Sequence, residues 1–185
     1  GIPLQSRNEY MIENMSFNKA YIHALEKYKE IDPLILLEKF KTNYMHYRQN
    51  WSGQPRGCIN QKLNGTNLLK NGRIPLCVDI ETASICDLAC DFCYRESLAT
   101  PDKIINEDLY KIIIDQSVEI GVPSVKLNWR GEPLLHPKLY KFIEYAKQKG
   151  ILEVIINTNA TNLNEKTSER LIDAGLDFMI YSFDG

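Results

Sequence analysis

The chain has 185 residues, of which 44% are apolar and 25% are charged, and its formal net charge at pH 7 is −2. This balance is typical of one globular domain with an appendage, and it excludes a strongly basic protein that binds nucleic acid or an anionic membrane by charge. No run of about 18 apolar residues is present, so the sequence predicts no membrane-spanning helix.

The first part of the chain has a helical pattern. From residue 8 to about 51, methionine, leucine and tyrosine recur at helical spacing, and Pro33 in "DPLILLEKF" is typical of the first turn of a second helix. Residues 52–75 are rich in Gly, Asn and Pro and predict a connector, in which Cys58 is an incidental loop cysteine. We therefore expect residues 1–75 to form a helical N-terminal extension and connector.

Strand and helix patterns alternate from residue 76 onward. Residues 76–81, "LCVDIE", alternate between two faces as a strand does, and a helix follows with Asn106 as N-cap and Gly121 as C-cap. Further strands are expected at 124–129, 152–159 and 176–185, with helices at 138–150 and 164–175. Strands separated by helices predict parallel pairing, so we expect residues 76–185 to form an α/β domain.

The helix expected at 138–150 has an apolar stripe that predicts which face it buries. The stripe consists of Leu139, Phe142, Ile143 and Ala146.

Each expected strand is followed by a polar cluster. The sequence "CDLACDFC" follows the first strand, "RGEP" the second, "NTNAT" closes the third and "SFDG" closes the fourth. Because the carboxyl ends of parallel strands lie on one face, we expect these four clusters to meet there and to form the functional site.

The cysteine run has the spacing C-x3-C-x2-C, at Cys86, Cys90 and Cys93. A disulfide framework is disfavoured because the total of five cysteines is odd and no apolar secretory segment opens the chain. A buried helical stripe is an alternative, since the three positions share one helix face. Three thiolates also suit an iron-sulfur cube, whose fourth iron would then have no protein ligand.

Zinc is the competing metal for these thiols. A structural zinc site needs four ligands, so Cys58, Cys77 or His136 would have to complete it. If the cysteines hold zinc or a purely structural cluster, the chain is a non-catalytic zinc- or iron-sulfur-binding module. This is the alternative to the hypothesis that the cysteines belong to the active site of an enzyme.

The cysteine run with Phe92 in its last gap, followed by a "GEP" turn after the next strand, resembles the radical S-adenosylmethionine (radical SAM) enzyme superfamily over about residues 76–185. The resemblance implies a [4Fe-4S] cluster held by Cys86, Cys90 and Cys93, and S-adenosylmethionine bound to its open iron. It also implies reductive cleavage to a 5′-deoxyadenosyl radical that abstracts hydrogen from a substrate. The implied fold is the front four strand–helix units of a partial, TIM-like (β/α)6 barrel.

The resemblance assigns further residues to the cofactor. Gly131, Glu132 and Pro133 match the turn that receives the amino group of the methionine moiety, although Arg130 replaces the first glycine of the usual pair.

The resemblance also assigns residues to the rest of the cofactor. Phe92 matches the aromatic position beside the adenine. The remaining matches are the strand-three segment with Thr158, in which Ala160 replaces glycine, and the strand-four end with Ser182 and Asp184. His136 is expected to cap or pack, and no catalytic residue is assigned.

The branch whose members add SPASM-type cluster domains is the one most resembled, which implies a peptide or surface carbohydrate as the substrate. An electron donor such as flavodoxin or ferredoxin and a cytoplasmic location are expected, with no nucleic acid or membrane partner. Because the sequence stops at the end of the fourth strand, we expect it to be the front part of a longer protein that does not turn over alone.

Overall fold

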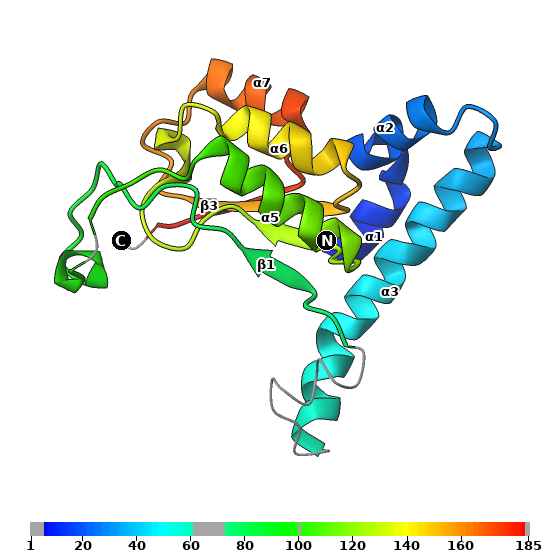
Figure 1. The fold of residues 1–185 in the computed structure, drawn as a ribbon, viewed down its shortest axis with the longest axis horizontal. Coiled ribbons are helices and arrows are strands. Elements are labelled where there is room, and N and C mark those ends of the chain that lie inside the picture. Colours follow the sequence, from blue (N-terminus) through cyan, green and yellow to red (C-terminus); the bar gives the residue numbers. More distant parts are fainter. Residues whose placement is uncertain (1–5, 61–72, 100, 184–185) are drawn as a thin grey trace, which may run out of the picture.

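The computed structural model describes residues 6–60, 73–99 and 101–183 (Figure 1). Four strands pair in parallel in the order β1-β2-β3-β4, which is the sequential order of strands in a β/α barrel. The strands are β1 (Cys77–Asp79), β2 (Ser124–Lys126), β3 (Glu153–Thr158) and β4 (Phe178–Tyr181). The parallel α/β fold expected from the sequence is therefore confirmed.

Three helices connect these strands and cover one face of the sheet (Figure 1). They are α5 (Glu107–Glu119), α6 (Leu139–Gln148) and α7 (Glu165–Ala174), and short 3-10 turns occur at Tyr94–Ser97 and Pro133–Leu135. Asn106 caps α5 as expected, because its side chain accepts hydrogen bonds from the amides of Asp108 and Leu109.

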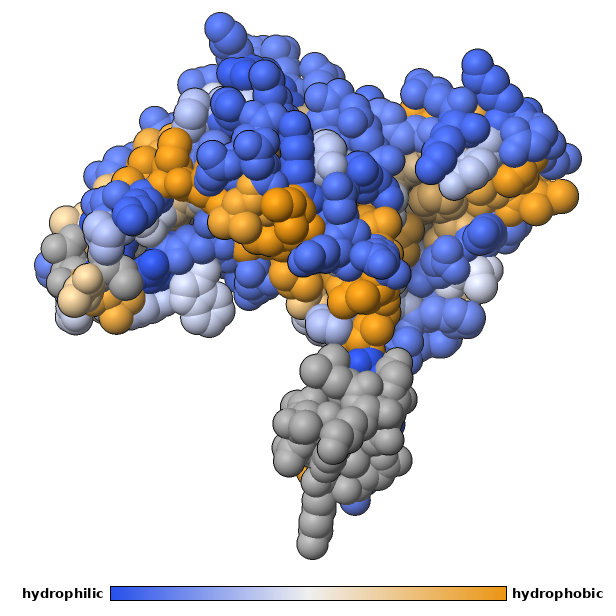
Figure 2. Space-filling model, in the orientation of Figure 1, coloured by the Kyte–Doolittle hydropathy of each residue, from blue (hydrophilic) through white to orange (hydrophobic). Residues whose placement is uncertain are grey.

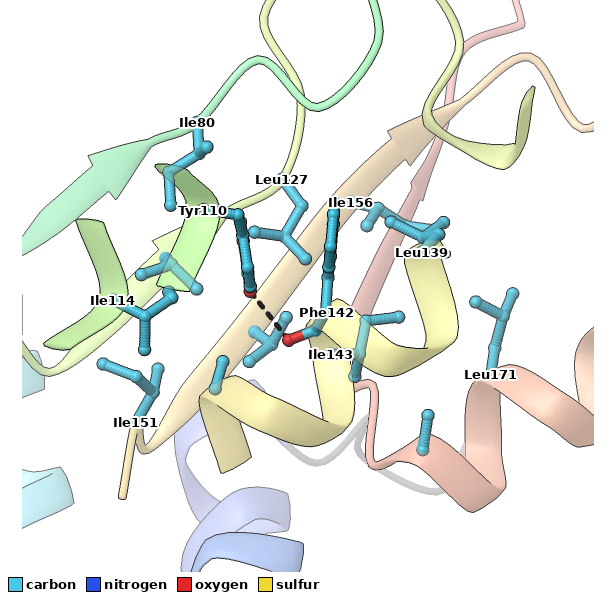
Figure 3. Close-up of a cluster of buried hydrophobic side chains, with 14 residues drawn as sticks. Ile80, Tyr110, Ile114, Leu127, Leu139, Phe142, Ile143, Ile151, Ile156 and Leu171 are labelled. Atoms are coloured by element: carbon cyan, nitrogen blue, oxygen red, sulfur yellow. Dashed lines mark hydrogen bonds between the residues drawn. The ribbon is translucent and has the colours of Figure 1, made fainter. Parts of the chain in front are cut away.

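The main core lies between the sheet and these helices (Figure 3). The whole stripe expected on α6 is buried there. Tyr110 of α5 stacks on Phe142 of α6 with ring centroids 4.1 Å apart, and its hydroxyl donates to the Phe142 carbonyl at 2.7 Å. The hydroxyl of this buried tyrosine is thus satisfied, and α5 is joined to α6.

The N-terminal extension packs at the amino ends of the strands, opposite the cysteine loop (Figure 1). It consists of α1 (Arg7–Glu13), a 3-10 turn (Met15–Phe17), α2 (Lys19–Lys27) and α3 (Pro33–Asn60). A second apolar cluster, around Met15, Tyr44 and Tyr47, holds α1, the 3-10 turn and α3 together. The Tyr47 hydroxyl donates to Glu153 of β3 at 2.8 Å, so the extension contacts the sheet directly.

The connector expected from residue 52 is wrong over residues 52–60, which continue helix α3 and include Pro55. Trp51, Pro55 and Ile59 line an apolar groove together with the segment that leads into β1. Arg73 of that segment donates to the Cys58 sulfur at 3.4 Å. Cys58 is therefore a helical residue and not a loop residue. Residues 61–72 of the expected connector lie outside the described residues.

Charged side chains are buried at the amino ends of the strands. Lys147 is fully buried, and its ammonium donates to Asp177 at 2.6 Å and to the Leu152 carbonyl at 3.0 Å. Asn18 of the extension donates to the same carbonyl at 3.0 Å. Burial lowers the pKa of Lys147 and raises the pKa of Asp177, while their mutual attraction opposes both shifts.

The surface is hydrophilic over α6 and α7, with apolar patches elsewhere (Figure 2). Exposed apolar residues include Leu109 and Ile112 of α5 and Leu34 and Ile35 of α3. None of the helices in the described ranges is long and apolar enough to cross a membrane.

Candidate active site

The cysteine loop leaves the sheet after β1 and is fixed at its base. Ala83 forms an antiparallel bridge with Ile104, and the Ile105 amide donates to the Thr82 carbonyl at 2.9 Å. Ser84 adds a side-chain hydrogen bond to the Lys103 carbonyl at 3.1 Å. The loop that carries the three cysteines therefore extends from a closed base at the carboxyl ends of the strands (Figure 1).

Cys86, Cys90 and Cys93 are free, half-buried thiols. The Cys93 amide donates to the Cys90 carbonyl at 2.9 Å, so these two positions form a tight turn and not part of a helix. The described residues hold no group of three or more potential ligands gathered closely enough for a single metal ion. A four-iron cube binds each thiolate on a different iron and does not need its ligands to converge on one point, so this finding does not count against a cluster held by the three thiols.

None of the three candidates for a fourth zinc ligand lies in this loop. Cys58 is in α3, and Cys77 is in β1, nine positions before Cys86, where burial raises the pKa of its thiol to about 11. His136 is buried, its Nδ1 accepts from the Lys138 amide at 3.0 Å, and its Nε2 lies 3.2 Å from the Ile105 carbonyl. This pattern indicates a neutral ring in a structural role, as expected, and burial lowers the pKa of His136.

The turn after β2 packs against the main chain just before Cys86. Gly131 has φ +64°, and a Cβ atom there would lie 2.4 Å from the Ile85 carbonyl oxygen and 2.5 Å from that of Ala83. The Glu132 amide donates to the Ile85 carbonyl at 2.7 Å. Only glycine fits such a close approach, so the retained glycine of the turn has a physical reason.

The Glu132 carboxylate points into the protein, with 2% of the residue exposed. Its Oε1 accepts from the Leu134 amide at 3.0 Å and from the Thr158 hydroxyl at 2.7 Å, and its Oε2 accepts from the Asn159 amide at 2.8 Å. The side chain therefore joins the turn after β2 to the end of β3.

Ala160 occupies the position where the resemblance expects glycine. Its φ is +63°, in the left-handed region that an alanine side chain disfavours. Its amide donates to the Thr158 hydroxyl oxygen at 3.0 Å. The turn thus keeps the conformation of a glycine turn without the glycine.

Asp87 joins the cysteine loop to the loop after β3. Its Oδ1 accepts from Asn159 Nδ2 at 2.8 Å, and its Oδ2 accepts from Asn162 Nδ2 at 2.8 Å and from the Thr161 hydroxyl at 2.5 Å. Partial burial acts to raise the pKa of Asp87, but these hydrogen bonds outweigh it and lower the pKa. In the sequence, the only signal for this contact is an acid directly after the first cysteine.

Arg130 pairs with Glu81, which lies between β1 and the cysteine loop. The guanidinium contacts both carboxylate oxygens, with Nε 2.8 Å from Oε1 and Nη2 2.9 Å from Oε2. The residue that replaces the first family glycine thus adds a second link between the ends of β1 and β2.

The other expected cofactor residues differ in exposure. Phe92 is 69% exposed on the cysteine loop, and Ser182 is exposed after β4, with its amide donating to the Thr158 carbonyl at 2.9 Å. Pro133 and Thr158 are buried. Asp184 lies outside the described residues.

Comparison with known proteins decides between the alternatives for this site. Residues 80–185 match the model of the radical SAM superfamily. The chain belongs to this superfamily. Its core therefore has a [4Fe-4S] cluster and S-adenosylmethionine as cofactors.

The curated relatives that match part of the chain include two with different printed functions. The chain is 36% identical over 100 residues to a probable GTP 3′,8-cyclase of Methanococcus maripaludis, covering 54% of this chain and 33% of that protein. It is 27% identical over 108 residues to the tungsten-containing aldehyde ferredoxin oxidoreductase cofactor-modifying protein of Pyrococcus furiosus, covering 57% of this chain and 30% of that protein. The chain thus spans about a third of the length of these relatives.

Two solved structures share the fold. BtrN in complex with AdoMet and 2-DOIA matches with a TM-score of 0.56 and 23% identity, covering 61% of this chain and 48% of that one. SuiB of Streptococcus suis bound to S-adenosylmethionine matches with a TM-score of 0.51 and 20% identity, covering 86% of this chain and 34% of that one. These likenesses agree with the partial-barrel fold.

Proposed function

We propose that the whole protein is a radical SAM enzyme, in which the reduced [4Fe-4S] cluster splits S-adenosylmethionine into methionine and a 5′-deoxyadenosyl radical that abstracts hydrogen from a substrate. The proposal rests mainly on the arrangement of the loop after β1. Three free thiols, at Cys86, Cys90 and Cys93, extend from a fixed base at the carboxyl end of a parallel sheet. Three thiolates leave one iron of the cube for the cofactor, and the protein's part is then to bind, orient and exclude water.

In this proposal, the turn at residues 131–133 receives the amino group of S-adenosylmethionine through its main chain. The turn is well placed because the Glu132 amide bonds to Ile85, directly before the first cysteine. A carboxylate has about four acceptor positions, and the Glu132 carboxylate uses three of them internally. Glu132 therefore supports the turn by fixing its position, and the buried Thr158 acts through the Glu132 carboxylate.

The exposed side chains are assigned to the rest of the cofactor. Phe92 is proposed to lie beside the adenine, since its ring extends from the cysteine loop into solvent. Ser182 and Asp184, after β4, are proposed to contact the ribose or the methionine carboxylate, as hydroxyl and carboxylate groups suit them.

The substrate is proposed as a class, a peptide or a surface carbohydrate, by resemblance to the SPASM-type branch. The names of the curated relatives point to other substrates, a nucleotide in one case and an enzyme cofactor in the other. They support the reaction type without selecting the substrate. An electron donor such as flavodoxin or ferredoxin and a reducing, cytoplasmic location complete the proposal.

Counting metals tests the proposal. The whole protein, purified and reconstituted without oxygen, is expected to contain at least about four irons and four sulfides per chain, with more if it also has auxiliary clusters. After reduction it is expected to release 5′-deoxyadenosine from S-adenosylmethionine. Stoichiometric zinc with no iron, or a full iron content with no 5′-deoxyadenosine, would contradict it.

A further inference from the structure

We propose that Asp87 is a positioning residue for the cluster: it holds the first cysteine of the loop against the end of β3 and orients the Asn159 amide toward the Cys86 sulfur. This inference rests on the proposed function, because it concerns how the same loop holds its cluster. Asp87 touches neither the cysteine sulfurs nor the cofactor in this assignment. It acts through the main chain of the loop and through Asn159.

The contact brings together residues that are 72 to 75 positions apart in the sequence. Three donors from the loop after β3, two amides and one hydroxyl, converge on the two oxygens of one carboxylate. An ionised carboxylate has only acceptor positions, so it matches three donors without leaving any of them unsatisfied. Hydrogen bonds to an ionised group are about twice as strong as those between neutral groups.

The first half of the cysteine loop, residues 86–89, is held by side-chain contacts and not by main-chain hydrogen bonds. The main chain is held at Ile85 by the Glu132 amide and again at the Cys90–Cys93 turn. Within the described residues, no main-chain hydrogen bond holds residues 86–89 between these points. Among the described residues, the side-chain hydrogen bonds of Asp87 therefore join the first half of the loop to the loop after β3.

Asn159 extends the effect to the sulfur. Its Nδ2 lies 2.8 Å from Asp87 Oδ1 and 3.9 Å from Cys86 Sγ. The bond to Asp87 fixes the amide plane, so that the second hydrogen of the same nitrogen is directed toward the sulfur. Hydrogen bonds to the ligand sulfurs help to set the reduction potential of an iron-sulfur cluster, so Asp87 acts on the potential through Asn159.

The experiment compares two isosteric changes in the same loop of the whole protein. Asp87→Asn turns an acceptor into an amide that faces three donors, whereas Asp91→Asn makes the same charge change at an exposed position. After anaerobic reconstitution, we expect a chelator to remove iron about tenfold faster from the Asp87 variant than from the wild-type protein, the usual scale for losing a supporting contact around a metal site. The Asp91 variant is expected to match the wild type.

A second pair of variants separates positioning from simple destabilisation. Asn159→Ala and Asn162→Ala each remove one amide donor to Asp87 at 2.8 Å, but only Asn159 faces the sulfur. Both variants are expected to release iron faster, and only Asn159→Ala is expected to lower the midpoint potential of the cluster. Equal potentials in the two variants would overturn the role of Asn159.

Failure of this inference is distinguishable from failure of the proposed function. If the wild-type protein holds its cluster and Asp87→Asn releases iron no faster than Asp91→Asn, the inference is wrong and the function stands. If the wild-type protein holds no cluster, the proposed function is wrong. The alkylation rate of Cys86 in the metal-free protein then still tests the contact, because Asp87→Asn is expected to raise it and Asp91→Asn is not. Equal rates would overturn the inference in that case too.

Discussion

The two ends of the sheet are built differently. At the amino ends, Lys147 and Glu153 are completely buried, and the N-terminal helices cover them and supply partners such as Tyr47. At the carboxyl ends, polar side chains also join neighbouring loops, but Phe92 and Phe183 are exposed, at 69% and 77%. The first arrangement holds the fold together, and the second holds three loops in place around a surface that is open to ligands. Changes at the amino end should therefore lower stability, and changes at the carboxyl end should affect the site.

The largest expected effect is at the amino end. Asp177→Ala leaves the ammonium of Lys147 buried without its charged partner and also removes the acceptor for the Val154 amide. Removing one partner of a buried ion pair typically costs about 3–5 kcal/mol. We expect a loss of this size in the free energy of unfolding, measured by urea denaturation. Asp173→Ala, on the exposed face of α7, is the matched control and should change little. A loss below about 1 kcal/mol for Asp177→Ala would show that the pair is not structural.

Glu132→Gln sharpens the comparison, because Glu132 is buried at the carboxyl end. The new amide group faces hydrogen-bond donors, so we expect the free energy of unfolding to fall by about 1–3 kcal/mol. We expect S-adenosylmethionine binding to weaken by a similar amount. Glu144→Gln, at an exposed position of α6, is the control. Denaturation and calorimetry measure the two effects. Normal stability with weakened binding would mean that the carboxylate meets the cofactor directly and that its internal bonds matter little.

Ala160→Gly is expected to stabilise the protein. The left-handed conformation costs an alanine about 1–2 kcal/mol, and the greater freedom of glycine in the unfolded chain offsets part of this gain. We therefore expect a net gain of about 1 kcal/mol in the free energy of unfolding. Gly175→Ala, at a helix end with φ +94°, should give the opposite sign. A destabilised Ala160→Gly variant would show that the methyl group has a packing role.

The smallest expected effect is the pH dependence caused by His136. Burial lowers the pKa of His136 below its ordinary value of 6.5. The unfolded chain therefore takes up a proton before the folded chain does, so stability is complete above about pH 6.5 and falls as the pH is lowered. His136→Asn keeps an acceptor for the Lys138 amide and does not titrate, so the fall should be smaller in this variant. His46→Asn, at an exposed position, is the control and should leave the pH dependence of the free energy of unfolding unchanged. The same pH dependence in His136→Asn as in the wild type would contradict this assignment.

The sequence predicted those features of the structure that depend on residues close together in the chain. Strand alternation, the Asn106 cap and the α6 stripe around Phe142 follow from near neighbours in the chain, and the spacing of the cysteines identified the loop. The side-chain contacts between loops were not predictable in this way. Asp87 and Asn162 are 75 positions apart, and no periodicity connects them. The helical course of residues 52–60 was missed because Gly53, Pro55 and Gly57 disfavour a helix locally, whereas α3 continues through them.

The most direct test of the account replaces each of the five cysteines by serine, one at a time, in the whole protein. The yield of 5′-deoxyadenosine after anaerobic reduction is then measured for each variant. We expect Cys86→Ser, Cys90→Ser and Cys93→Ser to lose both the product and the iron of this cluster, about four atoms per chain, because each change removes one ligand of the cube. Cys58→Ser and Cys77→Ser should keep both, since these thiols lie in α3 and β1, away from the loop. Full yield from any of the first three variants, or loss of iron from either of the last two, would contradict the assignment of the site.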